Sequence, residues 1–138
     1  MHVLRHTPSA RFDVIRPAGF RILTALGLVV DLCRVDLLVT CGTDSHALPD
    51  PHPLGEAYDV SVKGLSAQQI ADVKAELDKI LGPLFTVLYE VKCVPSDPTL
   101  RPIAYVNVGA TGPHFHIQRR KNTVYPPEPV TPPTPVVA

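Results

Sequence analysis

The sequence predicts an α+β fold, with a small, mostly antiparallel sheet and helices packed on one of its faces. Two segments place apolar residues at helical spacing, and four or five short segments are rich in β-branched and aromatic residues, as strands are. These segments seldom follow the strand–helix–strand order that a parallel sheet requires. The chain has 138 residues, of which 45% are hydrophobic, so we expect one compact domain.

The first half of the chain predicts one helix and one strand. Apolar residues recur at helical spacing over 17–34, and Pro17 fits the first turn of that helix. The residues before it carry no clear period. Residues 35–40 predict a short buried strand, in which Leu37, Leu38 and Val39 are consecutive apolar residues. A polar loop with three prolines then covers 41–55, and loops of such length are usually functional or disordered.

In the second half of the chain we predict a strand, then a helix, then three further strands. Residues 57–62 alternate between apolar and polar and predict a strand. The next helix begins after Ser66, because Gln69 three positions later completes a capping box, and Gly82 ends it. Three further strands are predicted at 85–91, 103–108 and 114–118.

The compact domain is predicted to cover residues 1–121, and residues 122–138 form a proline-rich tail. Six of the 16 prolines fall in the last 13 residues. Such a segment cannot bury a core, so we expect it to be extended or disordered. A plain spacer is one interpretation, and a polyproline ligand for the groove of a partner is another.

The composition excludes several classes of function. Thirteen basic residues balance 13 acidic ones, so no surplus of positive charge is available to bind nucleic acid or an anionic membrane. The longest apolar run, 22–33, is too short to cross a bilayer. The N-terminus does not resemble a signal peptide, so we expect synthesis in the cytoplasm. We also expect the protein to be a monomer. Neither a nucleotide-binding glycine motif nor the GxSxG motif of serine hydrolases is present.

Histidines and an aspartate gather in two segments of the sequence. His52 leaves the long loop, and Asp59 follows seven positions later in a predicted strand, where the intervening Gly55 lets the chain turn tightly. His114 and His116 are two residues apart in another predicted strand, so both imidazoles point to one face and Phe115 points to the other.

Two histidines and one aspartate make a ligand set that suits zinc. A catalytic zinc site has three protein ligands and keeps its fourth position for water, whose pKa the metal lowers to about 7. A single histidine is more often structural or exposed, and a His-x-His pair alone is weak support for a metal site. The two segments together, each at the end of a predicted strand, are far more specific.

These residues resemble a known family. The segment His-Pro-Leu-Gly-Glu-Ala-Tyr-Asp at 52–59 matches the HxxGxAxD signature of the zinc D-alanyl-D-alanine peptidases. The segment 114–116 is similar to the HxH signature of the wider group that joins these enzymes with lysostaphin-type peptidases and the hedgehog signalling domain. The order of helices and strands is also similar, and the resemblance covers about 20–118.

The resemblance implies one zinc ion per chain, bound by His52, Asp59 and His116. It implies that His114 lies beside the metal-activated water and stabilises the oxyanion or assists proton transfer. It further implies hydrolysis of peptidoglycan stem peptides, by a D-Ala-D-Ala carboxypeptidase or an endopeptidase of the endolysin type. The protein would then reach the cell wall during phage lysis or as part of a virion.

The resemblance leaves the general base open. Many relatives place an acidic residue three positions before the second histidine of HxH, where this chain has Pro113. Glu90 is the nearest candidate, and either Glu90 or His114 would take the proton from water and pass it to the leaving amine. The alternative for Glu90 is a solvated carboxylate at a strand end.

The long loop carries a second open assignment. Asp44-Ser45-His46 partly resembles an Asp-x-x-His segment of short relatives, so His46 would bind a substrate carboxylate or would be a loop histidine without a role. Relatives often have an arginine in this loop, and this chain has none between 41 and 59. Glu56 and Asp50 are expected to face solvent.

Two other functions fit the same sequence. One is a non-catalytic zinc-binding domain, as in the hedgehog branch. The other is a phage structural module with a vestigial site and the proline-rich tail as a tether. A functioning base would distinguish the peptidase from both.

Overall fold

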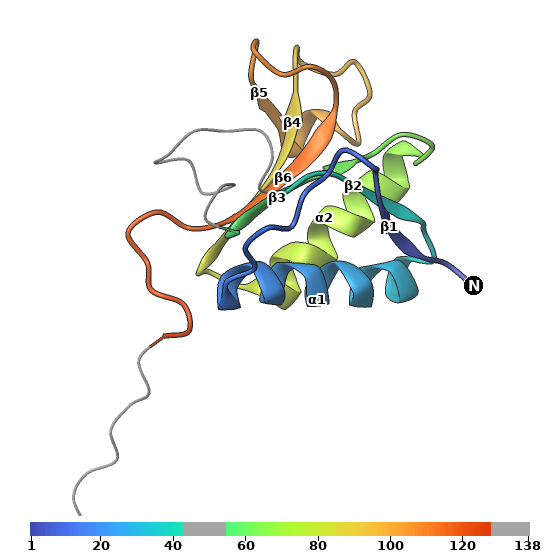
Figure 1. The fold of residues 1–138 in the computed structure, drawn as a ribbon. Coiled ribbons are helices and arrows are strands. Elements are labelled where there is room, and N and C mark those ends of the chain that lie inside the picture. Colours follow the sequence, from blue (N-terminus) through green and yellow to red (C-terminus); the bar gives the residue numbers. More distant parts are fainter. Residues whose placement is uncertain (43–54, 128–138) are drawn as a thin grey trace, which may run out of the picture.

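The computed structural model describes residues 1–42 and 55–127. Over these residues the elements lie in the order shown in Figure 1. The helices are α1 (Pro17–Cys33), α2 (Ala67–Leu81) and the short 3₁₀ helix η1 (Arg101–Ile103). The strands are β1 (Leu4–His6), β2 (Leu37–Cys41), β3 (Ala57–Ser61), β4 (Phe85–Val91), β5 (Ala104–Val106) and β6 (His114–Arg119). The α+β class predicted from the sequence is confirmed.

The strands form one sheet, which in the described part of the chain has the order β1-β2-β3-β6-β4-β5. The inner pairs β2–β3, β3–β6 and β6–β4 are antiparallel, whereas β1–β2 and β4–β5 at the two edges are parallel. The sheet is therefore mixed, and the mostly antiparallel prediction holds only for its centre. The prediction missed β1, whose three residues carry no period; α1 makes the crossover that lets it pair with β2 in parallel.

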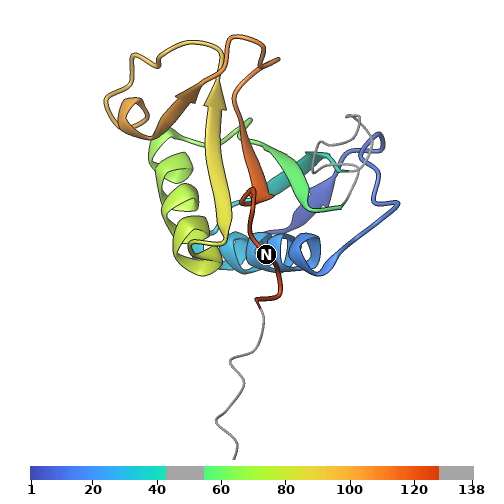
Figure 2. The same cartoon turned by 90° about the vertical axis from the view of Figure 1, so that its left-hand side faces the viewer.

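Helices α1 and α2 cover the same face of the sheet, as predicted (Figure 1; Figure 2). Alternation along β4 places Phe85, Val87, Tyr89 and Val91 in the core between sheet and helices. The residues between them, among them Glu90, point to the opposite face. We call this helix-free side of the sheet the open face.

The helix boundaries follow the local signals in the sequence. Pro17 occupies the first turn of α1, and the helix ends before Arg34, whose backbone is left-handed. In α2 the capping box is confirmed: Ser66 Oγ accepts a bond from the Gln69 amide at 3.1 Å, and Gln69 Oε1 accepts one from the Ser66 amide at 2.9 Å. No helix among the described residues is both long and apolar enough to span a membrane.

Gly55 is required by the backbone where the chain enters β3. Its φ is +69°, and a Cβ on it would lie 2.0 Å from the carbonyl oxygen of Val14. Any side chain would therefore clash with the segment that precedes α1. The glycine of the HxxGxAxD segment thus has a steric explanation, and it lets the N-terminal segment pack against the start of β3.

Part of the predicted tail lies against the domain. The ring of Tyr125 packs edge-on against Phe85, with 5.1 Å between ring centroids. The Arg120 amide donates to the Leu84 carbonyl at 2.8 Å, and the Thr123 amide donates to the Arg120 carbonyl at 3.3 Å. The proline-rich segment 128–138 is outside the described residues.

Tyr58 is one of the largest side chains of the core. It is fully buried on the helix side of β3, and its ring stacks on Phe12 at a centroid distance of 5.8 Å. Its hydroxyl has no hydrogen-bond partner among the residues that the structure describes. Burial disfavours the phenolate and raises the pKa of Tyr58 to about 12.

We expect Tyr58→Phe to change the unfolding free energy by less than about 1 kcal/mol at pH 7, because the hydroxyl offers no bond to lose. In the wild type the unfolded chain ionises this phenol near pH 10 and the folded chain near pH 12. Stability should therefore fall between these pH values, and less steeply in Tyr58→Phe. Urea titrations at pH 7 and over pH 10–12 measure both effects. The half-exposed Tyr105→Phe is the control, and an unchanged slope in Tyr58→Phe would contradict the burial effect.

Candidate functional site

Strand register brings the predicted site residues together on the open face. In the β3–β6 pair Asp59 lies directly opposite His116, and in the β6–β4 pair His114 lies directly opposite Glu90. Phe115, between the two histidines, is fully buried on the helix side. The prediction that both imidazoles share one face and Phe115 takes the other is therefore confirmed.

Asp59 and His116 are in direct contact. His116 Nδ1 lies 2.9 Å from Asp59 Oδ1, and His116 Nε2 lies 2.7 Å from Gln118 Oε1. The amide nitrogen of Gln118 donates to the Arg119 carbonyl at 3.4 Å, which agrees with its oxygen facing the histidine. A neutral ring carries one proton, so His116 can donate to only one of these two oxygens, and its other nitrogen presents a lone pair to an acceptor. Two acceptor atoms at this distance require a proton or a metal cation between them.

The positions of these two atoms agree with shared zinc ligation. Nitrogen and oxygen ligands lie about 2.0–2.1 Å from zinc, so two of them in a tetrahedron are roughly 3.3 Å apart. The observed 2.9 Å differs from that by less than about half an ångström. Gln118 also supplies the outer hydrogen bond that commonly orients a ligating imidazole.

The third predicted ligand, His52, and the predicted substrate-binding residue His46 lie outside the described residues. Within residues 1–42 and 55–127, no group of three or more histidine, cysteine, aspartate or glutamate side chains could hold a metal. The structure thus brings together two of the three predicted ligands, Asp59 and His116.

Glu90 and His114 form a second pair beside the first. His114 Nε2 lies 2.9 Å from Glu90 Oε2 and 3.9 Å from Asp59 Oδ1. His114 Nδ1 lies 2.8 Å from the Gly112 carbonyl, which can only accept a hydrogen bond, so this nitrogen carries a proton. The contact with Glu90 therefore needs one further proton, shared between Nε2 and Oε2.

The solvated alternative for Glu90 is wrong. Its side chain is only 14% exposed, because His114 covers one carboxylate oxygen and Asn107 contacts the other. Asn107 Nδ2 donates to Glu90 Oε1 at 2.9 Å, and Asn107 Oδ1 accepts from the Gly109 amide at 3.0 Å. The carboxylate is thus held from both sides.

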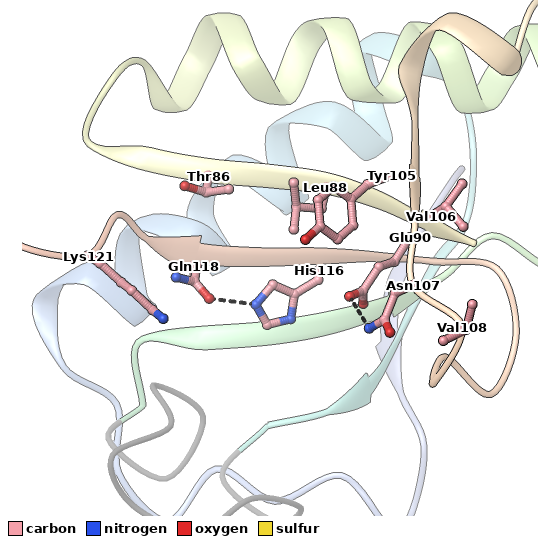
Figure 3. A pocket seen from close by; sticks show the side chains of 10 residues that line it. All are labelled: Thr86, Leu88, Glu90, Tyr105, Val106, Asn107, Val108, His116, Gln118 and Lys121. Atoms are coloured by element: carbon pink, nitrogen blue, oxygen red, sulfur yellow. Dashed lines mark hydrogen bonds between the residues drawn. The ribbon is translucent and has the colours of Figure 1, made fainter. Parts of the chain in front are cut away.

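A pocket of about 560 Å³ adjoins these residues on the open face (Figure 3). His116 stands near its middle, with the Gln118 contact on one side and the Glu90–Asn107 contact on the other. The lining comes from β4, β6, β5 and the residues just after β5 and β6: Thr86, Leu88, Glu90, Tyr105, Val106, Asn107, Val108, His116, Gln118 and Lys121.

The sequence prediction missed several polar residues of this site, among them Gln118, Asn107 and Lys121. Gln118 follows His116 by two positions in the same strand, so strand periodicity could have placed it on the same face. Asn107 and Lys121 had no such signal. They reach the pocket because of the turn after β5 and the chain path after β6.

Glu56 is buried, so the prediction that it faces solvent is wrong. It is only 6% exposed, and Arg119 contacts both of its oxygens, Nε to Oε2 at 2.6 Å and Nη2 to Oε1 at 3.5 Å. Arg119 also donates to the carbonyl of Thr123, and its own amide donates to the Glu56 carbonyl at 3.1 Å. This buried ion pair joins the start of β3 to the end of β6.

Comparisons of the chain with protein-family models, with curated proteins and with solved structures give no match.

We expect Arg119→Leu to lower the unfolding free energy by roughly 3 kcal/mol, the low end of the range for a broken buried pair, because Glu56 loses its nearest partner and keeps only Arg16, whose Nη1 lies 4.0 Å from Oε1. Adding Glu56→Leu should restore much of the loss. Asp78→Ala, which removes an exposed pair with Lys74 on α2, is the control and should cost less than about 1 kcal/mol. Urea unfolding at pH 7 measures all four proteins. Equal small losses for Arg119→Leu and Asp78→Ala would show that the Glu56 pair is not buried in solution.

Proposed function

We propose that this chain is a zinc-dependent peptidase of the D-alanyl-D-alanine peptidase type, with the related fold, and that it hydrolyses amide bonds in peptidoglycan stem peptides. One observation carries the proposal: Asp59 Oδ1 and His116 Nδ1, two atoms that can both ligate a metal, lie 2.9 Å apart, directly beside the Glu90–His114 pair. A cation site and a proton-transfer pair therefore adjoin each other at a pocket. The HxxGxAxD and HxH segments support the same function.

His52, Asp59 and His116 would hold the zinc ion, one per chain. Two imidazoles and one carboxylate leave a fourth position open, which is the arrangement of catalytic rather than structural zinc. Zinc, when bound there, supplies a Lewis acid that acidifies water and polarises a carbonyl group. Gln118 fixes the ring of His116 so that Nδ1, and not Nε2, is the ligating atom.

Glu90 is the group that we assign to proton transfer. As water adds to the scissile carbonyl carbon, the carboxylate takes one proton of that water. When the carbon–nitrogen bond breaks, Glu90 passes this proton to the leaving amine and returns to its starting state. Asn107 holds the other carboxylate oxygen and so keeps the accepting oxygen aimed into the site.

His114 is assigned to the oxyanion. Its Nδ1 proton is anchored on the Gly112 carbonyl, so the ring is held with Nε2 toward Glu90 and Asp59. The protonated Nε2 can donate a hydrogen bond to the carbonyl oxygen as negative charge develops on it, and it keeps its proton throughout. A donor fixed in advance lowers the barrier because it needs no reorganisation during the reaction.

The substrate would lie in the pocket on the open face. Leu88, Tyr105 and Val108 give it apolar walls beside the polar groups of the site. His46 remains our candidate for a substrate carboxylate, from the loop that precedes His52. On this proposal the protein acts at the cell wall, in phage lysis or as part of a virion.

We expect purified wild-type protein to hold about one zinc per chain, and His52→Ala, Asp59→Ala and His116→Ala to lose it. Gln118→Leu should weaken zinc binding by about 10- to 100-fold, because His116 loses the bond that orients it. Elemental mass spectrometry and competition with a chromophoric chelator measure content and affinity, and circular dichroism checks the fold of each variant. Wild-type protein without zinc, even after zinc is added back, would overturn the proposal.

We expect Glu90→Gln to lower kcat on a stem pentapeptide by about 10²- to 10⁴-fold while the zinc content is unchanged. Glu76→Gln, the same change on α2, is the matched control and should leave kcat unaltered. Chromatography of the released fragments measures the rate and identifies the bond that is cut. A zinc-bound wild type that cleaves no stem peptide would favour the non-catalytic zinc module instead.

A further inference from the structure

The pocket is electrically polarised along the strands. Glu90 and Asn107 lie at one end, and Thr86, Gln118 and Lys121 lie at the other, with His116 between them (Figure 3). Within this lining Glu90 carries the negative charge and Lys121 the positive one. A ligand carboxylate is therefore attracted to the Lys121 end, and the Glu90 end of this lining offers it no cation.

Register sets the distance between this cationic end and the reacting centre. Leu88 lies opposite His116, and Thr86 lies opposite Gln118, two residues further along the same pair of strands. Two strand residues correspond to about 7 Å, and an extended peptide advances by a similar length over two of its own residues. A group bound at Gln118 and Thr86 thus belongs to a residue about two positions from the bond at His116.

The side chains at the Lys121 end of the pocket differ in the hydrogen-bond donors and charges that they present to a ligand. The amide oxygen of Gln118 is bonded to His116, and its amide nitrogen is directed to the Arg119 carbonyl. The charge of neighbouring Arg119 is paired with Glu56. Lys121 is exposed, and the described residues give it no ion pair. Its ammonium is therefore the charge available to a ligand, with the Thr86 hydroxyl as a second donor.

We propose that Lys121, assisted by Thr86, binds a carboxylate of the substrate about two residues from the bond that is hydrolysed. This inference rests on the proposed peptidase function and adds a substrate requirement to it. The carboxylate fixes the direction of the peptide, because within this lining the Lys121 end offers it a cation and the Glu90 end does not. Lys121 is thus a specificity-determining residue outside the metal and proton-transfer groups.

Two carboxylates of a stem peptide have this chemistry. One is the free C-terminus, and the other is the α-carboxylate of the γ-linked D-glutamate. Three forms of a fluorescein-labelled pentapeptide, L-Ala-γ-D-Glu-L-Lys-D-Ala-D-Ala, separate them: the parent, its C-terminal amide, and the form with D-isoglutamine. If Lys121 binds the C-terminus, only the first amidation should abolish the effect of Lys121→Ala. If Lys121 binds the side-group carboxylate, only the second amidation should abolish it.

The experiment measures kcat and KM of the zinc-loaded enzyme on each peptide, and the Kd of each peptide for the Glu90→Gln protein by fluorescence anisotropy. We expect Lys121→Ala to raise KM and Kd for the parent by about five- to tenfold, with kcat little changed, since an exposed charge-assisted bond is lost. On the peptide whose anchoring carboxylate is amidated, Lys121→Ala should have no further effect. Lys121→Arg should retain binding of the parent.

Arg120→Ala is the matched control, because Arg120 is the preceding residue, is equally exposed and does not line the pocket. It should leave KM and Kd unchanged. Equal effects of Lys121→Ala and Arg120→Ala, or an effect of Lys121→Ala that persists on both amidated peptides, would overturn the carboxylate site. Cleavage that does not depend on Lys121 would overturn this inference and leave the peptidase. Lys121-dependent binding without any cleavage by the wild type would support the carboxylate site and overturn the peptidase.

Discussion

The site depends on the antiparallel pairing of β6 with both β3 and β4. This strand carries His114 and His116, and its two neighbours carry the carboxylates that they contact, Glu90 on one side and Asp59 on the other. A shift of either pair by one residue would turn every one of these side chains to the opposite face. Phe115 and Ile117 prevent this shift. Both are fully buried on the helix side, and their exposure to solvent would raise the free energy of the folded state. The hydrophobic core thus fixes the geometry of the polar face.

On the polar face, both ring nitrogens of His114 and of His116 lie against oxygen atoms. Asp59 faces Nδ1 of His116, whose Nε2 contacts Gln118, and Glu90 faces Nε2 of His114, whose Nδ1 donates to the Gly112 carbonyl. Each contact is stable only with a cation or a proton in it. We interpret the first as a place for a metal and the second as a place for a mobile proton, and these are the two components that amide hydrolysis by activated water requires. The Glu56–Arg119 ion pair differs from these contacts, because its two charges are opposite and compensate each other. It connects the start of β3 to the end of β6.

Local signals in the sequence predicted most of the described elements. The capping box at Ser66, the proline at the start of α1 and the glycine at the end of α2 each act within one turn of helix, so they can be read without knowledge of the fold. The three-residue strand β1 could not be found this way, because its place in the sheet comes from pairing with β2 across α1. The burial of Glu56 could not be predicted for a similar reason. Nothing near it in sequence marks it as buried, and its partner lies 63 residues later.

For the site, the sequence by itself determined which residues share a face and which chemistry they could carry. Strand alternation is a local property, so His114 and His116 could be placed on one side and Phe115 on the other before any contact was known. Only the tertiary structure decided that Glu90 lies against His114, that Asn107 and Gln118 hold the two reactive groups from outside, and that Lys121 ends the pocket. These contacts join residues from separate strands and from the turns that follow them. Their distances are set by register and loop path, which depend on how the whole core packs and which no short stretch of sequence encodes.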